Sequence, residues 1–203
     1  MTNPSPLRPN QPVTIVVPTY NRRHILEHTI ESYLRLTEDG HRLLVMDDAS
    51  TDGTADWLRD RGVEVLRVTR HQPLPAVRNI GLRACDSEWV LFGEDDVLFP
   101  PGHIAALRTA AAFLPTCAAI AGRLCPGTTF ALPPVAPPPS HGPLFDPRIA
   151  TADFNTHIPG PIPVPSLHAC ALVHRASALQ IGGYDASLTK SAFREESDLY
   201  ARL

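Results

Sequence analysis

Between residues 13 and 124, short apolar runs alternate with amphipathic segments, and this alternation limits the possible folds most strongly. The run at 13–17 is rich in β-branched residues, which is typical of a buried strand, and Pro18 is expected to end it. Similar runs at 43–46, 63–68 and 89–92 predict three more strands. Apolar residues recur at helical spacing after Asn21 and again after Pro101, which predicts two helices. Asn21 suits the N-cap of the first, and Pro101 suits the first position of the second. This order indicates an α/β fold whose mostly parallel central sheet is flanked by helices.

The alternation stops in a proline-rich stretch. Residues 126–165 hold more than half of the chain's 22 prolines, so they should supply neither central strands nor long helices. Scattered apolar residues favour a loop packed on the body over a disordered linker. We therefore divide the chain into a leader at 1–12, a first half at 13–124, the loop at 125–166 and a second half at 167–203, with a final helix from about Glu195.

The bulk composition excludes several classes of protein. A net charge of −3 gives no broad basic face for nucleic acid. No run approaches the length of a transmembrane segment, and the leader lacks a signal-peptide core, which predicts a soluble, cytoplasmic protein. The four cysteines lie far apart without zinc-ligand spacing, which favours buried, reduced thiols.

Acidic clusters follow two of the predicted strands, Asp47-Asp48 after the second and Glu94-Asp95-Asp96 after the fourth. Ligands of open parallel sheets bind beyond the carboxyl ends of the strands, so both clusters should face one crevice. Converging carboxylates repel one another unless a cation lies between them. Their hard oxygens suit Mg²⁺ or Mn²⁺, and such an ion also binds the phosphate oxygens of a diphosphate. The alternative is that these acids only cap turns and helices.

Five segments, in the same order and spacing, resemble motifs of family 2 glycosyltransferases. They are residues 13–22, 45–54, 76–81 with 92–96, 182–185, and 193–199. The resemblance implies a GT-A-like, Rossmann-related sandwich that transfers a sugar from a nucleoside-diphosphate sugar to an acceptor hydroxyl with inversion. The acceptor class stays open among glycans, lipid-linked acceptors and small molecules.

The resemblance also implies roles for residues of the first half. Pro18, Thr19 and Tyr20, with Asn21, would line the base and ribose pocket, and Asp48 or Asp47 would accept a base N–H. Arg78 would lie near the diphosphate. The competing interpretations are a packing role for the Tyr20 ring and a solvated helical arginine at position 78.

The resemblance implies a second set of roles, for the ligands of the divalent metal and for the catalytic base. Asp96, with Glu94 or Asp95, would hold the divalent ion, although the family usually has aspartate where Glu94 stands. Glu196 of the Glu195-Glu196 pair would deprotonate the acceptor hydroxyl. The alternative is that both glutamates simply favour a helix N-terminus.

Two other functions compete with glycosyl transfer. A sugar nucleotidyltransferase would need a basic, glycine-rich loop after the first strand, where this chain has Pro18-Thr19-Tyr20-Asn21. A non-catalytic nucleotide-sugar-binding domain is the other candidate, because the chain stops near the final helix and the acceptor half looks truncated. The oligomeric state is left open.

Overall fold

A computed structural model describes residues 10–114, 116–125, 127, 145–146, 151–152, 160–161, 163–164, 166–189 and 195–203, together with residues 4, 7 and 8. The order of elements is β1 (Val13–Thr19), α1 (Arg23–Glu38), β2 (Arg42–Asp47), α2 (Thr54–Arg59), β3 (Glu64–Arg67), α3 (Leu74–Ala84), β4 (Trp89–Phe92), α4 (His103–Ala111), β5 (Ala119–Ala121), β6 (Phe145–Asp146), β7 (Thr151–Ala152), β8 (Ala171–His174), α5 (Arg175–Gln180) and α6 (Glu195–Arg202).

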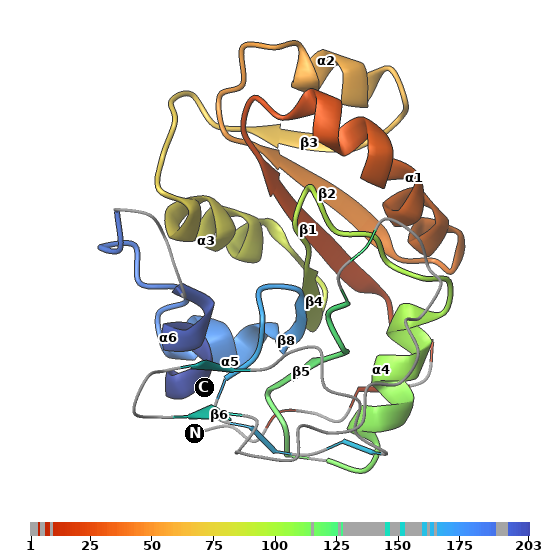
Figure 1. Ribbon diagram of the computed structural model, residues 1–203, viewed down its shortest axis with the longest axis vertical. Coiled ribbons are helices and arrows are strands. Elements are labelled where there is room, and N and C mark those ends of the chain that lie inside the picture. Colours follow the sequence, from red (N-terminus) through yellow and green to blue (C-terminus); the bar gives the residue numbers. More distant parts are fainter. Residues whose placement is uncertain are drawn as a thin grey trace.

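Six strands form the central sheet in the order β3-β2-β1-β4-β8-β5 (Figure 1). The four strands of the first half run parallel, whereas β8 pairs antiparallel with both β4 and β5. Helices cover both faces of this sheet. The predicted α/β class with a mostly parallel sheet is therefore confirmed.

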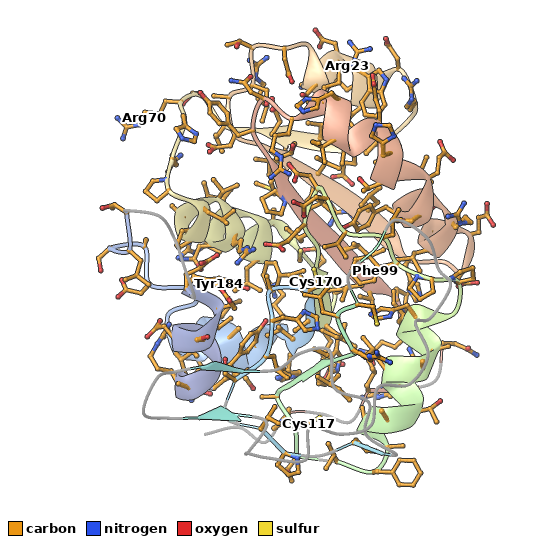
Figure 2. All side chains as sticks on the ribbon, in the orientation of Figure 1. Arg23, Arg70, Phe99, Cys117, Cys170 and Tyr184 are labelled. Atoms are coloured by element: carbon orange, nitrogen blue, oxygen red, sulfur yellow. The ribbon has the colours of Figure 1, made fainter. Side chains whose placement is uncertain are left out.

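Alternating side chains of the strands divide the core into two layers. On one face, Ile15 and Val17 of β1 pack with Leu26 and Ile30 of α1, and the layer extends to α2 and α4. On the other face, Val16 packs with residues of α3, α5 and α6. Because β1 is buried along its whole length, it needs apolar residues on both faces, as its sequence has. Figure 2 labels Phe99 and Cys170 of the first layer and Tyr184 of the second.

Helix α3 approaches the sheet closely at Gly81. A Cβ built on Gly81 would be 2.6 Å from Cγ1 of Val16, so only glycine permits this approach. The close packing fixes α3, which carries Arg78, against the centre of the sheet.

Two local expectations about the first strand and helix were wrong. Strand β1 continues through Pro18 to Thr19, because pairing with β4 ends at Val16 and the proline there has lost one neighbouring strand. Asn21 is not the N-cap of α1, which begins at Arg23. The Asn21 amide oxygen instead accepts the Thr51 N–H at 2.7 Å.

Beyond β4, the structure also differs in smaller ways from the sequence prediction. Helix α4 begins at His103 after a left-handed Gly102, two residues later than the proline at 101 suggested. Strand β5 was not predicted. Within the proline-rich stretch, β6 and β7 pair antiparallel, while the choice between packed loop and linker lies outside the described residues. None of the helices in the described part of the chain is long and apolar enough to cross a membrane.

Candidate functional site

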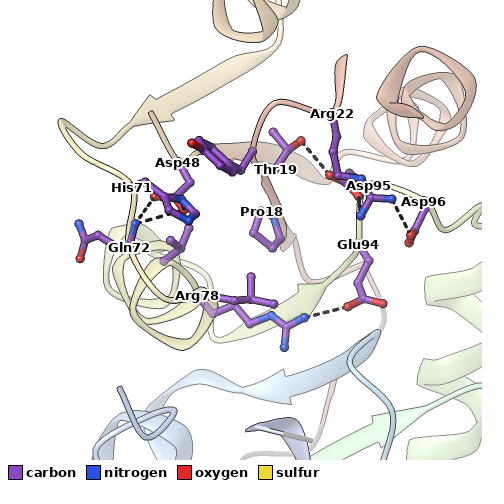
Figure 3. A pocket seen from close by; sticks show the side chains of 13 residues that line it. Pro18, Thr19, Arg22, Asp48, His71, Gln72, Arg78, Glu94, Asp95 and Asp96 are labelled. Atoms are coloured by element: carbon purple, nitrogen blue, oxygen red, sulfur yellow. Dashed lines mark hydrogen bonds and ion pairs between the residues drawn. The ribbon is translucent and has the colours of Figure 1, made fainter. Parts of the chain in front are cut away.

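A pocket of about 310 Å³ opens beyond the carboxyl ends of β1, β2 and β4. One wall comes from Pro18, Thr19 and Tyr20, a second from Asp48, residues 71 and 72 and three residues of α3, and a third from residues 94–96 (Figure 3). The parallel order of the strands brings their ends to one edge of the sheet. Both acidic clusters therefore contribute to one pocket, as the sequence predicted for this edge.

An aromatic stack forms one side of the pocket. The rings of Tyr20 and His71 lie 3.9 Å apart between centroids, with an interplanar angle of 18°. Nδ1 of His71 lies 2.7 Å from Oδ2 of Asp48, whose Oδ1 accepts the Gln72 N–H at 3.0 Å. Burial raises the pKa of Asp48, although the Gln72 N–H and the neighbouring His71 oppose that shift. Tyr20 is 39% exposed, which disfavours a pure packing role for its ring.

Asp47 shapes the loop that carries Asp48. Its side chain is fully buried, and Oδ2 lies 3.1 Å from Nε of Arg67. Oδ1 accepts the Ser50 N–H at 3.2 Å, closing a turn in which Ala49 has a φ of 63°. Asp47 does not belong to the pocket lining, so of the two acids Asp48 alone faces the cavity.

The third wall holds three carboxylates, two of which contact Arg22. Oδ2 of Asp95 accepts the Thr19 hydroxyl at 2.8 Å, and its Oδ1 lies 3.3 Å from Arg22. The same guanidinium donates to Oδ2 of Asp96 at 2.9 Å. Burial raises the pKa of Asp95, while the Thr19 hydrogen bond and the Arg22 charge lower it. Asp96 is the more accessible, with half of its side chain exposed.

Arg78 is buried completely, which excludes the solvated helical arginine. Its NH2 group donates to Oε1 of Glu94 at 3.0 Å, and its NH1 group donates to Oε1 of Glu195 at 2.5 Å. Burial raises the pKa of Glu195 to about 7, because desolvation outweighs the opposing attraction of Arg78. The first acid of the Glu195-Glu196 pair is thus part of a buried network beneath the pocket wall.

Glu196 lies next along α6 and is half-buried, outside the pocket lining. Burial raises the pKa of Glu94, and although Arg78 lowers it, the negative charges of Asp96 and Glu196 raise it further. Glu196 is therefore within electrostatic range of the acidic wall.

The Gly182-Gly183 turn packs against α3, so Gly183 does more than permit a tight turn. Asn79 accepts the Tyr184 N–H and donates to the Tyr184 carbonyl, both at 2.8 Å. A Cβ on Gly183 would overlap Oδ1 of Asn79, so this contact requires glycine.

Most of the predicted site residues meet in the pocket. They are Pro18, Thr19, Tyr20, Asp48, Arg78, Glu94, Asp95 and Asp96. The four predicted residues outside its lining are Asn21, Asp47, Glu195 and Glu196. Sequence reasoning missed Arg22, His71 and Gln72, although all three lie within a few residues of a strand's carboxyl end, which is a usable signal. Within the described ranges, no group of three or more histidine, cysteine or acidic side chains is arranged to hold a metal ion by itself.

Most of the chain matches the model of a known protein family. The family model for "Glycosyl transferase family 2" matches residues 14–168. A putative teichuronic acid biosynthesis glycosyltransferase from Bacillus subtilis is 31% identical over 101 residues, covering 47% of this chain and 38% of that protein. An uncharacterized glycosyltransferase from Haemophilus influenzae is 30% identical over 90 residues, covering 44% of this chain and 31% of that protein.

Solved structures of glycosyltransferases share the fold, and two of them illustrate the likeness. A mannosyltransferase from Pyrobaculum calidifontis, in complex with GDP-Man and Mn²⁺, has a TM-score of 0.63 at 22% identity and covers 97% of this chain and 52% of its own. S. aureus TarS in complex with UDP-GlcNAc has a TM-score of 0.61 at 18% identity, with coverage of 94% and 52%. The chain thus spans well under half of these curated relatives and about half of the solved chains.

Proposed function

The chain belongs to glycosyl transferase family 2, and we propose that it transfers a sugar from a nucleoside-diphosphate sugar to an acceptor hydroxyl with inversion. One observation carries the proposal: a single pocket joins an aromatic ring and a carboxylate on one side to a cluster of three carboxylates on the other. The first side suits a nucleobase, and the second suits a metal-bound diphosphate. Family membership also favours glycosyl transfer over nucleotidyl transfer.

The base and ribose would occupy the side formed by Pro18, Thr19 and Tyr20. An exposed aromatic ring offers a stacking surface to a base, and the Asp48 carboxylate accepts N–H groups. Leu74 and Val77 supply an apolar boundary nearby. The structural neighbours bind nucleotide sugars with different bases and sugars, GDP-Man in one case and UDP-GlcNAc in the other. The donor class proposed here is therefore nucleoside-diphosphate sugars, without a choice of base.

A divalent ion fits the residues at the opposite side. The exposed oxygens of Asp96 and Glu94 are hard ligands, and Mg²⁺ or Mn²⁺ is commonly held by one or two carboxylates together with substrate phosphates. Two protein carboxylates without a third ligand match that arrangement. The bound ion would neutralise the developing charge of the departing diphosphate.

Glu196 is the proposed base. Inversion requires a carboxylate that removes the acceptor proton as the hydroxyl oxygen attacks the anomeric carbon from the face opposite the diphosphate. Glu196 is half-buried near the acidic wall, whereas Glu195 is engaged by Arg78. Because Arg78 already binds the Glu195 carboxylate, Glu196 is the better candidate for proton transfer. The acceptor would approach from the α6 side of the pocket.

Ligand-dependent thermal unfolding tests the donor site. UDP, GDP and dTDP would each be added with Mn²⁺ or with chelator. At least one should raise the melting temperature with Mn²⁺ and much less with chelator, since a ligand that binds only the folded state stabilises it.

Asp96→Ala should abolish the Mn²⁺-dependent increment. Asp86→Ala, at an exposed position before β4, is the matched control and should retain it. If none of the nucleotides stabilises the wild-type protein with any divalent ion, the proposal fails. Nucleotide binding without sugar transfer to any acceptor would leave a binding domain instead.

A further inference from the structure

Arg78 joins two carboxylates that belong to distant parts of the chain. Its NH2 group contacts Glu94, which follows β4, and its NH1 group contacts Glu195, the first residue of α6 and 117 positions away in the sequence. The three side chains form a continuous chain of hydrogen bonds from the pocket wall to α6. Figure 3 shows its first link, between Arg78 and Glu94.

The burial of this network makes its geometry demanding. The Arg78 side chain is 0% exposed and that of Glu195 is 3% exposed. Removing one partner of a buried ion pair leaves an uncompensated charge, which is strongly destabilising. A planar guanidinium can reach two carboxylates through two different nitrogens, whereas a lysine ammonium is a single point charge. Arginine therefore suits a position that must hold two acids at once.

Helix α6 is fixed at its other end as well. Arg202 donates to the Ile181 carbonyl at 2.9 Å and to the Gly183 carbonyl at 2.8 Å. The Arg78–Glu195 contact therefore determines how the N-terminal turn of α6, which contains Glu196, sits against α3.

Arg78 is not accessible to a phosphate in this conformation, because its side chain is 0% exposed. Both terminal nitrogens already donate to carboxylates, and the remaining Nε is buried without a hydrogen-bond partner among the described residues. The guanidinium also lies over the Tyr184 ring at 5.4 Å from its centroid. Its influence on a bound diphosphate must therefore act through Glu94.

We propose that Arg78 is a positioning residue that holds the Glu94 carboxylate at the pocket wall and couples it to α6 through Glu195. This inference rests on the proposed function, because Glu94 is one of the two carboxylates assigned to the metal-bound diphosphate. A change at Glu195 then alters metal-nucleotide affinity, although Glu195 does not line the pocket.

Affinity measurements on the folded protein test the coupling. Mn²⁺-dependent affinity for the stabilising nucleoside diphosphate is measured by calorimetry, well below the melting temperature, for Glu195→Gln, Arg78→Lys and the double variant. Arg83→Lys, at an exposed position of the same helix, is the control. A merely structural role would lower the melting temperature without changing the affinity of the folded protein.

We expect Glu195→Gln to weaken affinity by at least about threefold and Arg78→Lys by about tenfold or more, with the double variant no weaker than Arg78→Lys. Wild-type affinity in Glu195→Gln, or full additivity in the double variant, overturns the proposal. The Arg83→Lys control should bind as the wild type does.

A ligand-free experiment separates this proposal from the function itself. Urea unfolding of Glu94→Gln, Glu195→Gln and their combination measures whether the two acids are coupled, first with Arg78 present and then in the Arg78→Lys background. Non-additive effects that become additive in the Arg78→Lys background support the link even if no nucleotide binds. Additive effects in both backgrounds overturn it, whatever the nucleotide experiment shows.

Discussion

The imidazole of His71 lies flat against the ring of Tyr20, 3.9 Å away between centroids, while its Nδ1 contacts the Asp48 carboxylate at 2.7 Å. His71 thus covers one face of the Tyr20 ring and contacts the carboxylate that the proposed nucleobase would use. Its side chain is 57% exposed, so few contacts oppose its movement. A bound base would compete with His71 for this place.

The competition predicts opposite effects for the two rings. Tyr20→Ala should weaken nucleoside diphosphate affinity by about fivefold or more, because the stacking surface is lost. His71→Ala should strengthen it by about two- to fivefold, because the open pocket becomes more populated. Calorimetric titration with Mn²⁺ present measures both. A loss of affinity in His71→Ala would instead mean that the imidazole contacts the base directly.

The Asn79–Gly183 contact predicts a loss of stability. Gly183 has a φ of 76°, and an added Cβ would overlap Oδ1 of Asn79. Gly183→Ala should therefore lower the free energy of unfolding by about 2 to 4 kcal/mol. Gly182→Ala is the matched control, because its φ is 90° but no described atom lies within 4 Å of the new Cβ.

That control should cost only about 1 kcal/mol, which is the strain of the left-handed backbone. Urea unfolding monitored by tryptophan fluorescence compares the two variants. Equal losses would show that the Asn79 contact adds nothing to the demand for glycine.

Local sequence patterns predict the parallel sheet and the edge at which the pocket opens. They do not predict which side chains form ion pairs with the site residues. Apolar runs specify the four parallel strands, and acids at their carboxyl ends must then share one edge. The burial of Arg78 depends on Glu195, far along the chain, so its helix gives no local sign of it. The split between buried Asp47 and pocket-facing Asp48 likewise depends on Arg67, which belongs to a neighbouring strand.

His103 predicts a pH dependence of stability. Burial lowers the pKa of His103 to about 4, and the neighbouring His168 contributes to the same shift. Between pH 6.5 and about 4 the unfolded chain binds a proton at this position and the folded chain does not, so stability falls as the pH falls. The loss attributable to His103 should reach about 3 kcal/mol at the acid end.

Urea unfolding from pH 7 to pH 4 measures this loss as a difference from His103→Gln, a neutral variant of similar size. The wild type should lose stability more steeply than the variant over that range. Parallel curves would show that His103 titrates alike in the folded and unfolded states.

The last prediction concerns the proposed base. Glu196→Gln keeps the size of the side chain but removes its ability to accept a proton, so sugar transfer should fall by about 10²-fold or more in kcat. Mn²⁺-dependent nucleotide affinity should stay within about twofold of the wild type, because Glu196 does not line the donor pocket. Glu31→Gln, at an exposed position of α1, is the control for removal of one negative charge and should leave both quantities unchanged. Since Glu195 is already engaged by Arg78, it should not replace Glu196 as the proton acceptor. Near-normal turnover in Glu196→Gln would move the base elsewhere in the protein, whereas a parallel loss of nucleotide affinity would assign Glu196 to the donor site.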